Sequence, residues 1–394
     1  MSLPPELLRP RYMGSSEPRI EDEALLRGAA TFVSDVRLAG MVELAVLRSP
    51  LAHACVRSID FSGALAVSGV LLAATAADLD DVAPFPDFMP WARPLRHRPL
   101  AGGTVLHVGQ PVALVVAEDR YVAEDALEAI TVEYEELPVI GSLEQALAAD
   151  GPRLYPEWPD NLVTDLPPDG DDALDELFRS SRVVRGRFVS HRHSGVPIET
   201  RGAVASFTGG RLTLWTSQQS PHIERTMLRL VLGLSERDIR VIAPAVGGAF
   251  GVKCHVYPED VLVAWASMRL GRPVRFVEDR YEHLVATNHA RDQVHELEAA
   301  VAEDGTIRAL RVRITQDIGS GQIWFAGIAP SFVSGAVSTG PYRIDRRSLH
   351  VRCAVTNKTP SGAYRGFGVP EMVFALERLI ERIADEVGVD SWDL

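Results

Sequence analysis

The sequence predicts an α+β fold, and three observations favour this class. Residues 111–134 contain a valine-rich strand, an amphipathic helix and a second strand in succession. Two glycine-rich turns, at 247–251 and 362–368, each lead within a few residues into Pro-Glu and then an apolar helix. Residues 291–318 contain two long β segments joined at an Asp-Gly pair, which is typical of a hairpin.

The strands and helices follow from local periodicity and from the residues that interrupt it. Helix 119–130 has its apolar residues on one face, and the helices at 220 and 258 begin at or just before a proline, which fits the first turn of a helix. The predicted helices are 119–130, 220–232, 258–270 and 370–387. The predicted strands are 41–48, 111–117, 131–134, 211–216, 238–243, 274–277 and the pair within 291–318.

Composition divides the chain into four segments. The first is polar and rich in proline, and the third combines several prolines with an acidic cluster, which is typical of a weakly structured linker. The segments are an N-terminal arm, 1–18; a compact α+β unit, 19–140; a linker, 141–180; and a second unit, 181–394.

The overall charge and hydropathy exclude several classes of protein. The 394 residues are 46% hydrophobic and carry a formal net charge of −13. Nucleic-acid binding and attachment to a membrane surface both need a basic face, so we expect neither partner. The sequence shows no signal segment at its start and no apolar run approaching the roughly 20 residues of a membrane span. We therefore expect a cytoplasmic protein.

The first glycine turn follows the predicted strand at 238–243. Glycines let the backbone approach a ligand closely, and N–H groups at the start of a helix attract anions. The turn is not a phosphate-binding loop of the Walker type, because Lys253 is not followed by Ser or Thr. A tight strand-to-helix connection that binds no ligand remains an alternative for this turn taken alone.

The second turn places Arg365 and Phe367 between glycines. An arginine in such a turn has a reachable guanidinium that suits an anion or a metal-bound oxygen, although a simple surface arginine is the alternative. Buried phenylalanines usually occur in periodic apolar runs, so Phe367 is the more informative residue. Gln219, between a predicted strand and helix, could donate an amide hydrogen bond to a ligand, whereas a surface glutamine is the simpler interpretation.

No metal site made by protein ligands is expected. The three cysteines, Cys55, Cys254 and Cys353, are far apart in the sequence, and the histidines show no ligand spacing. The same dispersion argues against a disulfide framework.

Together these motifs resemble the large, molybdenum-cofactor subunit of the xanthine dehydrogenase, aldehyde oxidase and carbon monoxide dehydrogenase-like family. The resemblance spans essentially the whole chain, and its motifs occur in family order. It implies an α/β hammerhead domain at 19–140, followed at 181–394 by the first half of the molybdenum-cofactor-binding region. The matching stretches are 17–35, 48–53, 108–119, 197–202, 215–222, 246–253 and 362–371.

The resemblance also implies roles for individual residues. Gln219 corresponds to the glutamine whose amide lies near the apical oxygen of molybdenum, Arg365 to the arginine of the second cofactor loop, and Phe367 to the aromatic that packs against the substrate ring. These three are the candidate catalytic residues. In the family the pterin dithiolene sulfurs hold the metal, so no protein ligand is needed. The cofactor-binding residues implied are Gln219, Gly247, Gly248, Ala249, Phe250, Gly251, Ala363, Tyr364 and Arg365.

Departures from the family pattern narrow the expected chemistry. The second turn lacks the cysteine that anchors copper in carbon monoxide dehydrogenases proper, which counts against carbon monoxide oxidation. Cys254 stands where purine oxidases carry glutamate, which counts against xanthine. Ala249 and Val252 replace glycines that are common in the first turn. No segment matches the family's C-terminal Gly-x-Gly-Glu, so we expect either that another polypeptide supplies the catalytic glutamate or that the chain is a fragment.

The implied function is that of a hydroxylase component that oxidises an N-heteroaromatic or aldehyde substrate with water as the oxygen source. The implied cofactor is a molybdenum–pterin, with the cytosine dinucleotide form left open. The implied partners are a subunit that carries the second half and the catalytic glutamate, a 2Fe–2S subunit and an FAD subunit. If this chain shares a hydrophobic core with a second half on another subunit, the isolated chain should expose a large apolar patch.

A non-catalytic structural or assembly subunit is the alternative function. The missing glutamate and the two replaced glycines favour it. The presence of Gln219, Arg365 and Phe367 favours the enzyme component instead, because a protein without the chemistry has little reason to hold all three.

Overall fold

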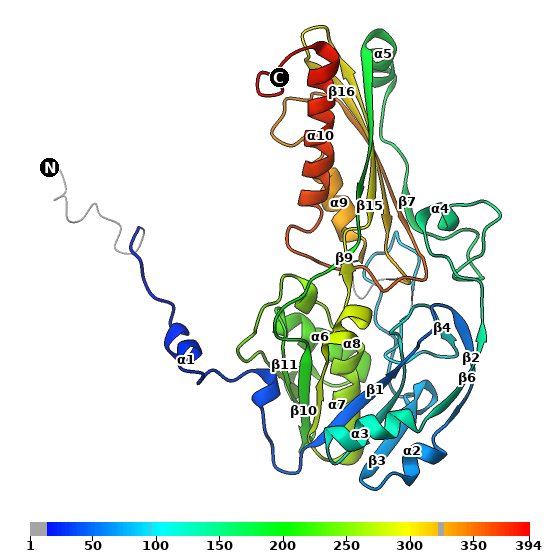
Figure 1. The fold of residues 1–394 in the computed structure, drawn as a ribbon, viewed down its shortest axis with the longest axis vertical. Coiled ribbons are helices and arrows are strands. Elements are labelled where there is room, and N and C mark those ends of the chain that lie inside the picture. The colour runs from blue at the N-terminus through cyan, green and yellow to red at the C-terminus, as the bar shows by residue number, and fades with distance from the viewer. Residues whose placement is uncertain (1–13, 96, 322–326) are drawn as a thin grey trace, which may run out of the picture.

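Two bodies, each with its own hydrophobic core, are stacked along the long axis of the molecule (Figure 1). The computed structural model describes residues 14–95, 97–321 and 327–394. The α+β class predicted from the sequence is confirmed. In the described part of the chain, no helix combines the length and the apolar character that crossing a membrane requires.

The lower body is built on a seven-stranded sheet that joins residues from both predicted units. Its central strand β13 (Val274–Val277) runs parallel to β1 (Val42–Arg48), with Val42 opposite Val274. The segments 19–140 and 181–394 therefore share one sheet and one core instead of folding as separate bodies. The strand order is β12 (Ile239–Ile242), β11 (Arg211–Thr216), β10 (Gly202–Thr208), β13, β1, β5 (Pro111–Ala117) and β3 (Val70–Thr75).

The helices α6 (Pro221–Leu232) and α7 (Pro258–Leu270) pack in the lower core. α7 is apolar around most of its circumference, so it is buried along most of its length. Even its large Trp265 is only 2% exposed. Both helices begin with a proline and end at a glycine with positive φ, Gly233 or Gly271, which explains why their bounds are sharp.

A three-stranded sheet completes the lower body, in the order β4 (Thr104–Val105), β2 (Ala54–Asp60), β6 (Thr131–Glu136). The predicted strand–helix–strand segment is present as β5, α3 (Arg120–Glu128) and β6, but its two strands belong to different sheets. The burial of the strands gives the reason. β5 is buried at every position and suits the centre of a large sheet, whereas β6 is half-exposed and suits a small antiparallel one. The short helix α2 (Ser62–Ala66) packs beside β3.

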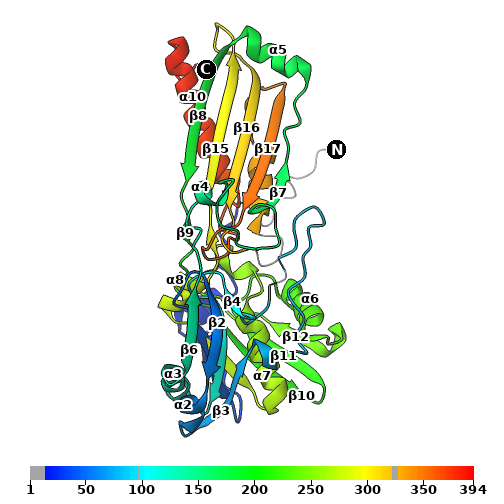
Figure 2. The ribbon, with the colours of Figure 1, turned by 90° about the vertical axis from the view of Figure 1, so that its right-hand side faces the viewer.

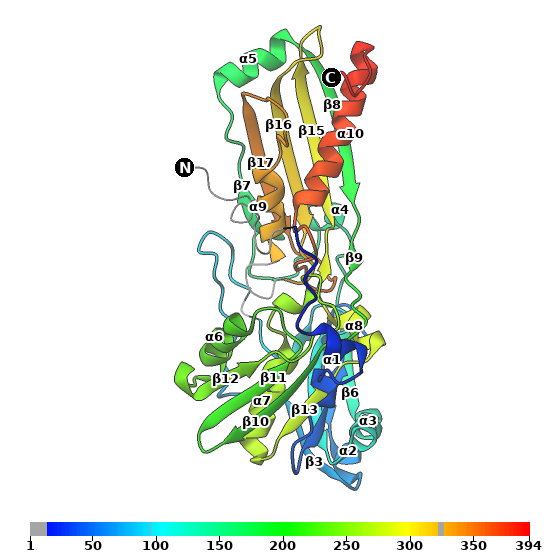
Figure 3. The same ribbon diagram turned by 90° about the vertical axis from the view of Figure 1, so that its left-hand side faces the viewer.

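The upper body is a five-stranded sheet: α5 (Asp172–Ser180) packs against one face through Leu174 and Phe178, and two further helices cover the opposite face (Figures 2 and 3). α10 (Val369–Val387) runs along that face and contributes Leu376, Leu379 and Ile383 to the upper core, beside α9 (Ala329–Ala336). The predicted hairpin is confirmed as β15 and β16, joined around Gly305 at φ +89°. The strand order is β7 (Leu162–Leu166), β17 (Arg347–Ala354), β16 (Ile307–Asp317), β15 (Gln293–Val301) and β8 (Arg182–Ser190).

Residues 141–180, which we expected to form a weakly structured linker, contain α4 (Leu143–Ala146), β7 and α5 (Asp172–Ser180). β7 pairs with β17, and its Val163 is 1% exposed in the upper core. The prolines of this segment lie between the elements and not inside them, so they interrupt the local pattern without preventing β7 from pairing.

Short elements complete the described chain. The predicted arm at 1–18 lies largely outside the described residues, which continue into α1 (Asp22–Leu26), a helix with no buried residue that projects from the body (Figure 1). Between the two bodies, β9 (His193–Ser194) pairs with β14 (His289–Ala290), near α8 (Arg280–Ala286). The single-turn helices are η2 (Val33–Asp35), η3 (Ala76–Asp78), η4 (Glu236–Asp238) and η5 (Val252–Cys254).

Candidate functional site

The two glycine turns, here called the first loop (246–251) and the second loop (362–368), lie directly against each other. The backbone N–H of Arg365 donates to the backbone oxygen of Phe250 at 2.8 Å. Gly251 has φ +103°, and a Cβ added to it would lie 2.9 Å from the Ala363 carbonyl oxygen and 3.1 Å from the Tyr364 Cα. A glycine is therefore required at position 251, both for its φ and for the close approach of the second loop.

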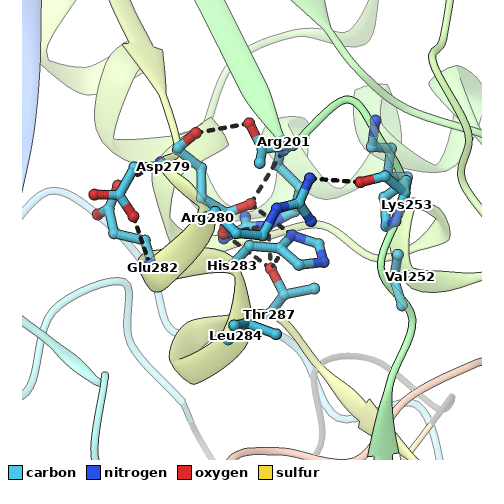
Figure 4. Close-up of polar contacts among 12 residues, drawn as sticks. Arg201, Val252, Lys253, Asp279, Arg280, Glu282, His283, Leu284 and Thr287 are labelled. Carbon is cyan, nitrogen blue, oxygen red and sulfur yellow. Dashed lines mark hydrogen bonds and ion pairs between the residues drawn. The ribbon is translucent and has the colours of Figure 1, made fainter.

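Glu199 anchors the first loop from below. Its Oε2 accepts a hydrogen bond from the backbone N–H of Gly247 and pairs with Lys253 Nζ, both at 2.7 Å. The Lys253 side chain, labelled in Figure 4, is completely buried, and burial lowers its pKa while Glu199 opposes that shift. Glu199 lies in the 197–202 stretch that carried part of the family resemblance, but no role for it followed from the sequence.

Gln219 lies at the junction of β11 and α6, and its side chain is exposed. The backbone N–H of Gly251 donates to Gln219 Oε1 at 2.9 Å, and the backbone N–H of Gln219 donates to the Lys253 oxygen at 2.8 Å. An N–H group can donate only to the oxygen of an amide, so this contact fixes which way the Gln219 amide points. Its Nε2 has no hydrogen-bond partner in the described part of the chain and is free to donate to a ligand.

Five of the predicted cofactor-binding residues use their backbone N–H groups inside the protein, since those of Gln219 and Arg365 already have the partners given above. The N–H groups of Gly247 and Gly251 bind Glu199 and Gln219, and that of Ala363 donates to His255 Nε2 at 2.8 Å. The resemblance implied that the first-loop N–H groups face a ligand, and for these two glycines the structure differs. The N–H groups that have no partner among the described residues include those of Gly248, Ala249 and Phe250, which form the tip of the first loop.

Two predicted site residues of the second loop, Arg365 and Phe367, differ in how far their side chains are exposed. The Arg365 side chain is exposed and forms no ion pair within residues 14–95, 97–321 and 327–394. Phe367 is partly buried at φ +49°, and its N–H donates to the Tyr364 oxygen at 2.8 Å. The Tyr364 ring packs edge-on against His193 with centroids 4.5 Å apart, so it supports the loop from within.

Arg291 holds the second loop from the side of α10. Its guanidinium donates to the Arg365 carbonyl oxygen at 2.9 Å and pairs with Glu371 at 2.6 Å. Arg291 and Asp292 both have positive φ, 67° and 59°, a strained conformation for residues other than glycine. Nothing in the sequence pattern indicated these residues, because both act through contacts with distant segments.

A buried ionic network lies beneath the first loop (Figure 4). The Arg201 guanidinium pairs with Glu278 at 2.5 Å and Glu259 at 3.0 Å, and it stacks on the Tyr257 ring at 3.7 Å. His283 adds a contact from its Nδ1 to Glu278 at 2.9 Å. These ion pairs hold the pKa of Glu278 at about 2, against the opposing effect of burial.

The network also fastens the two predicted units to each other. Arg48, on β1, pairs with Glu259 of α7 at 2.8 Å and with Glu282 of α8 at 2.9 Å. Its side chain is 9% exposed. A buried arginine that bridges two carboxylates from distant parts of the chain sets the position of α7 and α8 below the loops.

The donors that remain at the loops suit a ligand rich in anionic oxygens. They are the Gln219 amide, the Arg365 guanidinium and the N–H groups at the tip of the first loop. The described residues contain no group of three or more His, Cys, Asp or Glu side chains arranged to hold a metal ion. A metal at this site would have to arrive with its own ligands.

Comparison with known proteins identifies the family. The model for the molybdopterin cofactor-binding domain matches residues 154–394, and that for the a/b hammerhead domain of aldehyde oxidase and xanthine dehydrogenase matches residues 27–138. The chain belongs to the xanthine dehydrogenase and aldehyde oxidase family of molybdenum hydroxylases. The resemblance to the large, cofactor-binding subunit, including its hammerhead domain, is thereby confirmed.

Individual members of this family are similar over nearly the whole chain. The carbon monoxide dehydrogenase large chain of Afipia carboxidovorans is 38% identical over 97% of this chain and 49% of its own length. The crystal structure of quinoline 2-oxidoreductase from Pseudomonas putida 86 superposes with a TM-score of 0.90 at 39% identity, over 96% of this chain and 49% of that one. This molybdenum hydroxylase chain thus spans about half the length of both relatives.

A third relative has a comparable length. The nicotinate dehydrogenase large molybdopterin subunit of Eubacterium barkeri is 28% identical over 98% of this chain and 88% of its own length. Molybdopterin subunits of the size of this chain therefore occur among its relatives.

Proposed function

We propose that this chain is the molybdenum-cofactor-binding component of a multi-subunit hydroxylase that oxidises an N-heteroaromatic or aldehyde substrate with water as the oxygen source. One observation supports the proposal above the others. The first and second loops are in direct contact, yet the Gln219 amide and the Arg365 guanidinium beside them keep their donors free. A subunit that had lost the cofactor has no need of this arrangement.

The residues at the loops fit a molybdenum–pterin cofactor, as molybdopterin cytosine dinucleotide or without the nucleotide. When bound, the cofactor supplies a redox centre that accepts two electrons from the substrate carbon. The N–H groups of Gly248, Ala249 and Phe250 would bind its oxygens, and Arg365 would bind an anionic part. Gln219 would donate its Nε2–H to an oxygen at the metal, and Phe367 would orient an aromatic substrate.

The half of the molybdenum subunit that this chain does not contain would provide the catalytic glutamate as the proton acceptor. The similar length of the nicotinate dehydrogenase subunit supports placing that half on another polypeptide. Subunits with 2Fe–2S and FAD groups would take the electrons away. The quinoline and nicotinate relatives support an N-heteroaromatic substrate, and the lack of a cysteine in the second loop argues against carbon monoxide.

Metal analysis of the purified complex tests the proposal. The chain is produced with the genes adjacent to its own, purified through a tag on this chain, and analysed for molybdenum and for pterin. We expect about one molybdenum per copy of the chain. A complex that contains the partner subunits but no molybdenum would contradict the proposal and support the structural or assembly subunit instead.

The substitution Gln219→Met tests the role of the free amide. Methionine fills a similar volume without donating, so we expect kcat to fall about tenfold to a hundredfold while KM changes little. Gln145→Met is the matched control, because the Gln145 Oε1 also accepts a backbone N–H, from Gly141 at 2.7 Å, but in α4. Equal effects of the two substitutions would show that Gln219 only stabilises its turn.

The isolated chain is expected to self-associate through an apolar surface near the loops. Ile198 is 96% exposed, and Phe250, Val373 and Phe374 are each more than two-fifths exposed. We expect size-exclusion chromatography to show oligomers or aggregates in the absence of partners, and Val373→Lys to shift the chain towards monomer. Tyr121→Lys, at an exposed site on α3, should leave the profile unchanged. A stable wild-type monomer would contradict the prediction.

A further inference from the structure

The buried side chain of Gln218 uses all of its hydrogen-bonding groups. Its Oε1 accepts the backbone N–H groups of Gln219 at 2.9 Å and Ser220 at 3.3 Å. Its Nε2 donates to Glu224 Oε2 at 2.9 Å and to the backbone oxygen of His255 at 2.8 Å. The two backbone N–H groups can only donate and the His255 backbone oxygen can only accept, so these partners fix the orientation of the Gln218 amide. A fully satisfied buried amide of this kind defines a single local geometry.

His255 connects Gln218 to the second loop, because its backbone oxygen binds Gln218 and its side chain binds Ala363. Its side chain is completely buried, and its Nε2 accepts the backbone N–H of Ala363 at 2.8 Å. The contact is tight on this side, because a Cβ added to Gly362 would lie 2.7 Å from the same nitrogen. Gln218 thus binds the backbone of His255, and the His255 side chain binds the second loop. Gln218 also binds the backbone of Gln219.

We propose that Gln218 and His255 are positioning residues that hold Gln219 and the second loop at a fixed separation, so that the donors of both act on one ligand. This inference rests on the proposed function, because it concerns the same cofactor site. Neither residue faces the space where the ligand would bind, since both side chains are buried. Their effect on the reaction is transmitted through the backbone of Gln219 and of Ala363.

Glu224 supports the amide of Gln218 from the opposite side. Its side chain is buried in the first turn of α6, and its Oε1 has no hydrogen-bond partner in the described part of the chain. Burial, together with neighbouring Asp260, raises the pKa of Glu224 well above its ordinary value. A neutral Glu224 can accept from the Gln218 amide without placing an isolated negative charge in the core.

An exchange of the two side chains tests the pairing. Gln218→Glu removes the donor to Glu224 and to the His255 oxygen, and it brings two carboxyl groups together. We expect at least a tenfold fall in kcat and faster amide hydrogen exchange in peptides that contain Gln219 and in peptides that contain Ala363. Gln218→Glu combined with Glu224→Gln restores one donor and one acceptor between the two positions. We expect the double variant to return to within about threefold of the wild-type exchange rate at the Gln219 peptide, while the Ala363 peptide stays faster because the donor to the His255 oxygen is not restored.

A second pair of variants approaches the same connection from the second loop. His255→Leu removes the acceptor for the Ala363 N–H and should speed exchange at the Ala363 peptide. It should also speed exchange at the Gln219 peptide, although no hydrogen bond joins Gln219 to the imidazole. His255→Gln keeps an acceptor and should give a smaller effect. Should Gln218→Glu fail to accumulate, this second pair still tests the inference.

The measurements separate this inference from the proposed function. Hydrogen exchange is measured on the purified complex, and molybdenum content is measured on the same samples. Wild-type complex without molybdenum would contradict the proposed function, whereas the exchange results would still test the connection. Faster exchange confined to the substituted segment, or no recovery at the Gln219 peptide in the exchanged double variant, would overturn the inference. Gln145→Glu, at an exposed amide on α4, is the control and should alter neither peptide.

Discussion

Arg201→Met is expected to lower the free energy of unfolding by about 3–5 kcal/mol, the usual cost of removing one partner from a buried ion pair. Arg201 is the only guanidinium among the described residues that contacts both Glu278 and Glu259, and its side chain is 6% exposed. Without it, the side chain of Glu278, which is completely buried, keeps His283, a threonine and the backbone N–H of residue 201 as partners, but no guanidinium. Methionine fills similar space, so the loss reports the unpaired charge and not a cavity.

An exposed arginine provides the control for this prediction. Arg57 pairs with Glu135 on the three-stranded sheet, and both side chains are more than half exposed. Arg57→Met should cost far less than Arg201→Met, because water screens such a pair. Both variants are compared with wild type by urea unfolding at neutral pH. Equal losses would show that the network beneath the first loop contributes no more than a surface pair.

The dependence of stability on pH should identify Glu278 as the group concerned. Its pKa is about 2 in the folded protein, below the ordinary value of 4.5, so its contribution is complete above pH 4.5 and is lost as pH falls through 2. Arg201→Met removes the largest attraction that holds this pKa down. The difference in unfolding free energy between wild type and the variant should therefore shrink as pH falls below 4.5. A constant difference across this range would contradict the assignment.

Gly251→Ala is expected to separate the two loops and abolish most cofactor binding. The added Cβ would lie 2.9 Å from the Ala363 carbonyl oxygen and 3.1 Å from the Tyr364 Cα, both backbone atoms, so the second loop has to move. We expect molybdenum content in the complex to fall at least tenfold. The combined strain of φ +103° and the close contacts should also cost about 2–4 kcal/mol of stability.

Gly233→Ala separates the effect of backbone strain from that of the contact. Gly233 ends α6 with φ +67°, and no atom lies within 4 Å of an added Cβ. The substitution should cost about 1–2 kcal/mol and leave molybdenum content unchanged. If Gly233→Ala lowered molybdenum as much as Gly251→Ala did, the loss would come from general destabilisation and not from the meeting of the loops.

The sequence predicted about half of the longer elements, and it placed several of these closely. The helices at 220–232, 258–270 and 370–387 are present as α6, α7 and α10 with bounds that differ by no more than one residue. The strands at 111–117, 211–216 and 274–277 match β5, β11 and β13. These elements are marked by local signals, namely periodic apolar residues interrupted by proline and glycine, which act within a few residues along the chain.

The pairing of strands could not be predicted in the same way. β1 and β13 are 232 residues apart where Glu43 binds Arg275, and no local pattern records that they lie side by side. The same limitation explains why β7 was not predicted. Its segment contains prolines and acidic residues, and only its pairing with β17 and the burial of Val163 stabilise it as a strand.

The candidate site divides in a similar way. Gln219, Arg365 and Phe367 stand in or beside unusual local patterns, and the family resemblance that those patterns carry made them candidates. Gln218, His255 and Glu199 could not be recognised, because each acts by binding the backbone of a segment distant in the sequence.

By itself, the sequence determined the family, the elements with strong local signals and the two glycine loops, since motifs and periodicity are properties of neighbouring residues. Only the tertiary structure decided which N–H groups stay free, that the two loops touch through Phe250 and Arg365, and that Arg201 neutralises two buried carboxylates. Hydrogen bonds and ion pairs act over about 3 Å of space, whatever the separation along the chain. Contacts of this kind exist only once the chain has folded.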